Sequence, residues 1–224
     1  MGTVDLIILL SKKLAQGSAY MIMVPILIGF FRFNKLETHI KLLLYYMCVS
    51  AMVEMYGLLL VEKGTNNLFL FHISSFVEII FLLFVYFKES ETLLSKNNLY
   101  VLLLVNTFVA FGDAFIWGNV KIFNAYSLTV GSVILIFVSI RYYYLLMKNL
   151  NVQRIERNAM FWVNTGVLIY YAGNLFTFAG TKFLSGSLFD FYLMWGLHSI
   201  MNILMLLMFS SAFVWSKKIE PIRW

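Results

Sequence analysis

The sequence predicts an all-α integral membrane protein, a bundle of seven transmembrane helices in one domain. Apolar residues make up 61% of the 224 residues and charged residues only 12%, whereas soluble domains are nearer half apolar and a quarter charged. The apolar residues are gathered in stretches of about 20, the length at which a helix crosses a bilayer. Short polar segments separate the stretches without a Pro/Gly-rich linker, so residues 1–224 are expected to form a single transmembrane domain.

The seven apolar stretches follow one another along the chain. The first contains Pro25, which predicts a kink because proline removes a backbone hydrogen bond from a helix. Residues 3–13 precede it and are too short to span, so they form either an interfacial helix or an extension of the first span. The expected spans are 14–33, 40–61, 67–88, 97–117, 121–147, 158–180 and 188–215.

The Lys and Arg residues predict the orientation. Twelve of the 17 lie on one side of the expected bundle and five on the other. Because cytoplasmic loops are enriched in Lys and Arg, the N-terminus is expected outside and the C-terminus in the cytoplasm of a plasma membrane, the inner membrane of a bacterium. The net charge of +6 does not indicate nucleic acid, since the basic residues lie between apolar stretches, beside the headgroups of the lipid bilayer.

Polar residues inside the spans are the candidate ligand-binding groups, because charged side chains are costly in lipid. The fourfold spacing of Asp190, Met194, His198 and Asn202 places them on one helical face. Most of the candidates map to the outer half of the bundle, which predicts a water-accessible pocket lined by the second, third, sixth and seventh spans. The candidates are Glu54, His72, Glu78, Tyr171, Asn174, His198 and Asn202, with Asp113 and Asp190 as further candidates.

Several of these residues also have a purely structural interpretation. Asp190 follows Ser187 by three residues, the spacing of a capping box, so it equally fits a cap of the seventh span. Asp113 borders an outer loop and is expected to be solvated there. His198 fits a packing histidine bonded to a neighbouring helix, and Trp195 fits an interfacial anchor.

Three function classes remain open, and a receptor-like or sensory module for a small ligand or cation ranks first. Such a module needs a separate cytoplasmic signalling partner, because the chain carries no catalytic domain. A membrane-embedded metal-dependent hydrolase of lipids is the second class. No cofactor is firmly implied, but a metal ion is allowed at His72, His198, Glu54 and Glu78. A small proton- or cation-coupled transporter that uses the two glutamates is the third class.

The hydrolase class lacks one expected motif. Seven-helix hydrolases of the adiponectin-receptor and ceramidase type carry paired histidines, H-x-x-x-H, in the last span. The last span of this chain has only His198, which speaks against a site of three histidines.

The third span resembles that of a group of uncharacterised bacterial seven-helix membrane proteins. In those proteins an Asn-Leu-Phe entry leads to a His and, six residues later, to a Glu. The matching residues are Asn67, Leu68, Phe69, His72 and Glu78. The resemblance covers one span and the overall layout. It implies that His72 and Glu78 belong to one site, and it supplies no activity.

Overall fold

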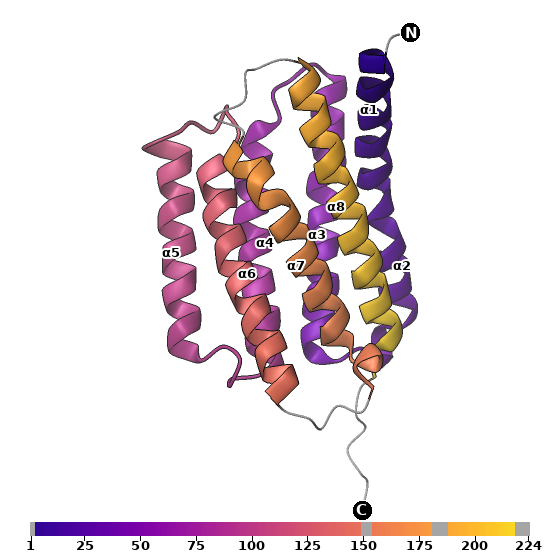
Figure 1. Ribbon diagram of the computed structural model, residues 1–224, viewed down its shortest axis with the longest axis vertical. Coiled ribbons are helices and arrows are strands. Elements are labelled where there is room, and N and C mark those ends of the chain that lie inside the picture. Colours follow the sequence, from indigo (N-terminus) through magenta and orange to yellow (C-terminus); the bar gives the residue numbers. More distant parts are fainter. Residues whose placement is uncertain (1–2, 149–153, 181–187, 218–224) are drawn as a thin grey trace, which may run out of the picture.

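A computed structural model describes residues 3–148, 154–180 and 188–217 of the chain. These residues are helical, with no strand among them (Figure 1). The elements are α1 (Thr3–Met21), α2 (Met23–Phe31), α3 (Thr38–Glu62), α4 (Leu68–Glu89), α5 (Lys96–Phe115), α6 (Ala125–Lys148), α7 (Ala159–Gly180) and α8 (Leu188–Trp215), with the short 3-10 helices η1 (Phe33–Lys35) and η2 (Ile155–Arg157).

The chain is a polytopic helical membrane protein. Among the described residues, six segments are long and apolar enough to cross a bilayer. They are Val4–Phe31, Thr38–Glu62, Leu68–Glu89, Lys96–Phe115, Ala125–Lys148 and Leu188–Trp215. The expected sixth span, 158–180, coincides with the 22-residue helix α7, which packs between α6 and α8.

The first apolar segment is longer than the expected span 14–33. Helix α1 begins at Thr3, so residues 3–13 extend the span and do not lie as a separate helix. A turn at Ile22 separates α1 from α2. Pro25 explains this break, because its ring clashes with the carbonyl four residues earlier, at Met21, and it has no N–H to donate. The kink predicted from Pro25 is therefore confirmed.

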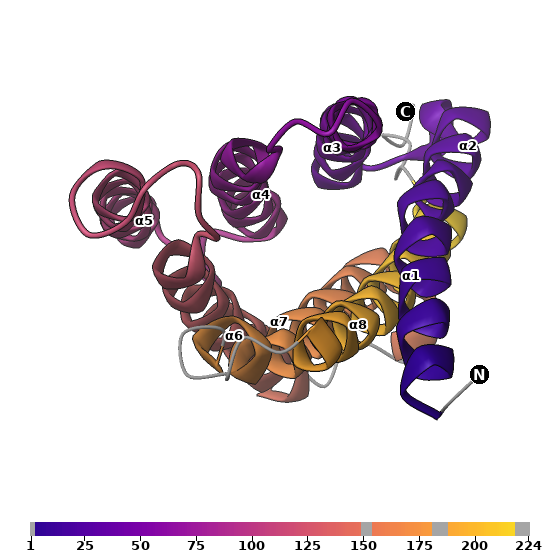
Figure 2. The same cartoon turned by 90° about the horizontal axis from the view of Figure 1, so that it is seen from above.

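The helices form two layers joined at both sides. Viewed from above, α3, α4 and α5 make one layer and α6, α7 and α8 the other, with α1 and α2 across one side (Figure 2). Helix α1 packs on α8, and α6 packs on both α4 and α5, which closes the opposite side. The α3–α4 and α5–α6 loops lie at the upper end in Figure 1, and the α2–α3 and α4–α5 connections lie at the lower end.

The apolar core occupies the lower half of the bundle. It is built from the first halves of α3 and α7 and from the second halves of α4, α6 and α8, which run to the same end. Fully buried members include Leu43, Leu83, Leu135, Val163 and Phe209. In the upper half these helices do not contribute a comparable core, so space remains between the layers.

A hydrogen-bonded cluster joins three helices within the lower core. The Tyr86 hydroxyl of α4 donates to Asn164 Oδ1 of α7 at 2.7 Å and lies 2.8 Å from Ser139 Oγ of α6. The Asn164 amide nitrogen donates in turn to the Ser139 carbonyl at 3.3 Å. All three side chains are fully buried, and each polar group has a partner, as a membrane interior demands.

Replacing Tyr86 with Phe is expected to lower the free energy of unfolding by about 1 kcal/mol, because Asn164 and Ser139 lose a buried partner. Unfolding of the purified protein in mild detergent measures the change. Tyr144→Phe is the matched control, since Tyr144 is 59% exposed. Equal stability of the two variants would contradict a stabilising role for the cluster.

Candidate functional site

A large cavity separates the two layers in the upper half of the bundle. Its volume is about 720 Å³, and its walls come from α1, α3, α4, α7 and α8, with smaller contributions from α6 and the α5–α6 loop. The expected four spans therefore line it, together with the first helix. The lining includes Asn67 and Leu188, the latter 72% exposed at the first residue of α8, so the cavity reaches the upper end.

Five of the predicted site residues line this cavity. Glu54 projects from α3, Glu78 from α4, and Asp190, His198 and Asn202 from α8. The fourfold spacing on α8 explains the last three, because residues four apart share one helical face. Tyr46 and Ser50, each four residues before the next on α3, continue the face of Glu54 into the cavity.

The remaining predicted residues lie behind the wall. Tyr171 is 1% exposed, and its neighbour Tyr170 lines the cavity instead. Asn174 is fully buried and lies 3.2 Å, through Oδ1, from His198 Nδ1, so it positions the imidazole without facing the cavity. His72 is buried, and its Nε2 lies 3.1 Å from the Ile122 carbonyl of the α5–α6 loop.

The resemblance of the third span implies that His72 and Glu78 belong to one site. The structure places Glu78 in the cavity wall and turns His72 toward the α5–α6 loop. His72 thus contacts the segment that precedes α6, next to Phe123 in the lining. The six-residue spacing accounts for this separation, since residues six apart point in different directions on a helix.

Asp113 has a structural role that differs from the expected one. The sequence predicts a solvated carboxylate, but this residue is 2% exposed and outside the cavity lining. Its Oδ2 accepts the backbone N–H of Ser127 at 2.8 Å, in the first turn of α6. Helix N-termini leave backbone N–H groups without partners inside the helix. The carboxylate of Asp113 satisfies one of them and complements the helix dipole.

Glu54 and Glu78, two acidic residues of the cavity, have no cationic partner among the described residues. The lining side chains that the structure describes include no Lys or Arg. In residues 3–148, 154–180 and 188–217 the ion pairs involve only His39, at the opposite end. The Tyr46 and Tyr171 hydroxyls lie beside the Glu78 carboxylate. Glu54 is exposed to the cavity. A carboxylate at this depth is costly without a counter-charge, so these groups favour a proton, a cation or a positively charged ligand group.

An aromatic cluster borders the cavity above Glu54 and Glu78, and the sequence did not reveal it. Phe71 of α4, Phe123 of the α5–α6 loop, and Phe191 and Trp195 of α8 all line the cavity. The Trp195 ring centroid lies 5.6 Å from that of Phe71 and 6.0 Å from that of Phe191. Trp195 is therefore part of the cavity wall, which its interpretation as an interfacial anchor did not anticipate. The available sequence signal for a place in the cavity wall was that Trp195 directly follows Met194, which lies on the polar face of α8.

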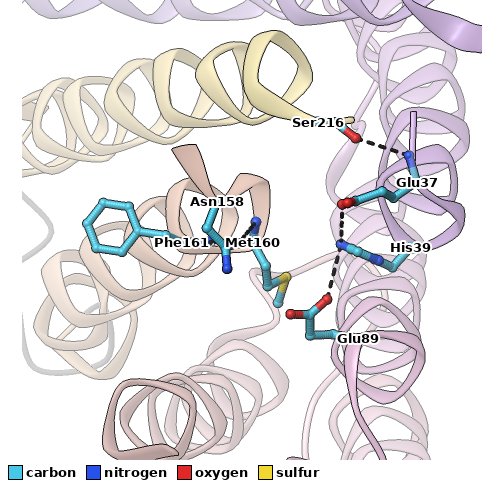
Figure 3. A network of polar contacts seen from close by, with 7 residues as sticks. All are labelled: Glu37, His39, Glu89, Asn158, Met160, Phe161 and Ser216. Carbon is cyan, nitrogen blue, oxygen red and sulfur yellow. Dashed lines mark hydrogen bonds and ion pairs between the residues drawn. The ribbon is translucent and has the colours of Figure 1, made fainter. Parts of the chain in front are cut away.

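A second polar cluster closes the lower end of the bundle (Figure 3). His39 Nε2 of α3 lies 3.2 Å from Glu89 Oε2 of α4 and 3.5 Å from Glu37 Oε2. The Glu37 N–H donates to Ser216 Oγ, just after α8, at 3.0 Å. Burial raises the pKa of the Glu37 carboxyl. The cluster thus connects α3 to α4 through the His39–Glu89 contact and to the end of α8 through the Glu37–Ser216 hydrogen bond.

A small cavity of about 300 Å³ lies beside this cluster. Its lining carries both signs of charge, with Glu37, His39 and Glu89 facing Arg154, Arg157 and Lys217. Asn158, also in the lining, accepts the Met160 N–H at 2.8 Å and caps the start of α7. The sequence did not single out these residues, because each lies at a helix end, where charged residues are ordinary.

The described residues provide no metal centre. No group of three or more His, Cys, Asp or Glu side chains within them has the geometry to hold a metal ion. His72 contacts a backbone carbonyl and His198 contacts an amide, so the two imidazoles do not converge. What the upper cavity can do chemically is to hold a ligand and to exchange protons through its carboxylates.

Comparisons with family models, curated proteins and solved structures find no match to this chain. The geometry of the cavity and of the lower cluster is therefore the basis for any functional proposal.

Replacing Asp113 with Ala is expected to lower the free energy of unfolding by about 1–3 kcal/mol, because the buried Ser127 N–H loses its acceptor. Asp113→Asn retains an acceptor oxygen and should lose less. Thermal unfolding of both variants in detergent gives the comparison. If instead Asp113→Ala is as stable as the wild type, the helix cap contributes little and the structural role assigned to Asp113 is wrong.

Proposed function

We propose that the protein is a receptor-like or sensory membrane module of seven spans whose upper cavity faces the outside and binds a small ligand or cation. Helix α7 supplies the remaining span in this arrangement, because it is long enough to cross and packs between two spanning helices. The N-terminus then lies outside and the C-terminus in the cytoplasm. The lower end carries Arg32, Lys35 and Arg157 among other basic residues, which agrees with a cytoplasmic location.

The observation that carries the proposal is the cavity with two carboxylates, Glu54 and Glu78, facing into it. Binding sites for small molecules are clefts of about 300–1,000 Å³ with apolar walls and a few convergent polar groups, and this cavity has that size and composition. Lipid cannot satisfy the carboxylates, so water, protons or a ligand must. The lower half is closed by a packed core, so a ligand would not enter from the lower end.

The output of such a module would come from helix movement. A ligand between α3–α4 and α7–α8 would draw the two layers together. The lower cluster of Glu37, His39 and Glu89 joins α3, α4 and α8, so its distances would change as these helices move. A cytoplasmic signalling partner would then read the lower end, where Arg154, Arg157 and Lys217 surround a cavity.

Thiol labelling tests whether the cavity is wet, outward-facing and cation-selective. Cys48 is the one cysteine of the chain, so a Cys48→Ala background accepts single cysteines at Ser50 or Ser74, which line the cavity. A cationic methanethiosulfonate should label both positions in intact cells about tenfold faster than an anionic one, after normalisation to a free thiol, because acidic clefts concentrate cations. Glu54→Gln should reduce this ratio.

Two controls make the labelling decisive. Ser132 is fully buried in α6, so a cysteine there should stay unlabelled. Glu91→Gln, in the exposed α4–α5 connection, should leave the ratio unchanged. Labelling at Ser50 only in inside-out vesicles would reverse the orientation, and no labelling in either preparation would refute the wet cavity.

A transporter is the second candidate, and the small lower cavity favours it. The upper and lower cavities lie at opposite ends of the bundle, both carry acids, and packed residues such as Leu43, Leu83 and Phe209 separate them. Alternate opening of the two ends would move a cation across the membrane. The charged cluster around His39 would form the lower gate in that scheme.

Flux measurements separate the two candidates. The receptor proposal predicts that the fluorescent aromatic cation ethidium enters proteoliposomes no faster than protein-free liposomes, with or without a pH gradient. Faster entry that Glu78→Gln abolishes would favour the transporter over the receptor. The same entry rate in the wild type and Glu78→Gln, above the liposome rate, would point to leakage and would leave neither candidate supported by flux.

A further inference from the structure

We infer that the upper cavity binds a protonated amine that carries an aromatic body, with the ammonium group between Glu54 and Glu78 and the body against the aromatic cluster. This inference rests on the proposed function, since it requires that the cavity admit a ligand. It goes further by assigning the chemical class and the orientation of that ligand.

The depth of the cavity groups gives the orientation. Counted from the upper helix ends, Phe71 lies three residues down α4 and Trp195 seven residues down α8, which is roughly 5 and 10 Å. Glu54 and Glu78 lie eight and ten residues down α3 and α4, which is roughly 12 and 15 Å. Asp190 lies two residues from the upper end of α8, so a ligand entering from above passes this carboxylate and the aromatic rings before it reaches Glu54 and Glu78.

The charges in the cavity require a cationic head. Glu54 and Glu78 have no ion pair with any described residue, and no described Lys or Arg lines the cavity. The nearby Lys12 of α1 is exposed, with its Nζ over the Tyr192 ring at 4.8 Å, and is not in the lining. A cation from outside would form an ion pair with these carboxylates. The attraction between the cation and the carboxylates is stronger in the cavity than in bulk water, because the cavity is partly desolvated.

The groups around the acids favour an ammonium that has N–H donors. The Tyr46 and Tyr171 hydroxyls lie beside the Glu78 carboxylate, and Tyr46 is also beside Ser50. Hydroxyl and carboxylate oxygens accept hydrogen bonds, and an R–NH3⁺ group offers three donors. Of these groups, Tyr46, Ser50 and Glu78 line the cavity. A quaternary ammonium has no donor and would form no hydrogen bond with their oxygens.

The upper wall fits an aromatic body. The Phe71, Phe123 and Trp195 rings lie in mutual contact, with centroids 5.6 to 6.4 Å apart, and Phe191 extends the cluster. Rings of a ligand pack on such a surface in tilted or edge-to-face geometry. The same rings contribute cation–π attraction to an ammonium group as it passes toward the acids.

Binding of three matched probes to the full chain in nanodiscs of neutral lipid tests the inference. 4-Phenylbutylamine should bind saturably and raise the unfolding temperature. The neutral 4-phenylbutan-1-ol and the donor-free 4-phenylbutyl-trimethylammonium should bind at least tenfold more weakly. Glu54→Gln and Glu78→Gln should each weaken the amine at least tenfold and leave the alcohol unchanged. Glu62→Gln, on α3 like Glu54 but outside the cavity lining, should bind all three probes as the wild type does. Trp195→Leu should weaken all three probes.

The outcomes distinguish this inference from the proposed function. Equal binding of amine and alcohol would overturn the cationic head, and equal binding of the amine and the trimethylammonium probe would overturn the need for N–H donors. No binding of any probe, in a protein whose cavity cysteines are labelled from outside, would overturn the ligand class and leave the proposed function standing. Absence of both binding and labelling would remove both.

Discussion

Close packing in the lower half of the bundle is the constraint on which the rest of the structure depends. The apolar core joins α3, α4, α6, α7 and α8 there, and its side chains are almost fully buried. Interiors packed at this density hold their helices in one arrangement. Because the helices are fixed below, the layers above can remain apart without collapsing, and the space between them is the upper cavity. The upper end of the bundle therefore holds a cavity, and the lower end holds a closed core.

The polar residues divide into two groups that match this difference between the closed core and the open cavity. Three uncharged polar residues inside the lower core, Tyr86, Ser139 and Asn164, are hydrogen-bonded to one another. Five ionisable residues lie at the margins of the core, Glu54 and Glu78 in the cavity and Glu37, His39 and Glu89 at the lower end. Water or a ligand can reach them in both places, which lowers the cost of charge in a membrane protein. These five residues are therefore located where exchange with the surroundings can occur.

The two ends of the bundle are mechanically related. Helices α3, α4 and α8 line the upper cavity, and the same three helices meet in the lower cluster through His39, Glu89 and Ser216. The α2 end is also attached to α8, since Arg32 Nε donates to the Phe213 carbonyl at 2.9 Å. A rigid shift of α8 relative to α3 and α4 would change both ends together. Coupling of this kind needs two discrete arrangements of a packed element, and α8, packed on α1, α2 and α7, is the element placed to supply them.

Apolar length and Lys/Arg spacing predict the helical membrane class and most of the element bounds, because these features are local and do not depend on which helices meet. It also placed Glu54, Glu78, His198 and Asn202 on polar faces, since helical periodicity is a local property. The kink near Pro25 followed from the chemistry of one residue.

What those polar faces contact is known only from the folded bundle. Asp113 is a buried helix cap and Trp195 a cavity residue, and the sequence neighbours of Asp113 do not indicate its role. The aromatic cluster and the lower cluster combine residues from three or more helices or loops, at sequence separations that periodicity cannot connect. The choice between Tyr170 and Tyr171 in the wall depends on the rotation of α7 against α6 and α8. The rotation and pairing of helices are set by packing across the whole bundle. Packing involves several segments at once, so the pattern within one segment does not predict it.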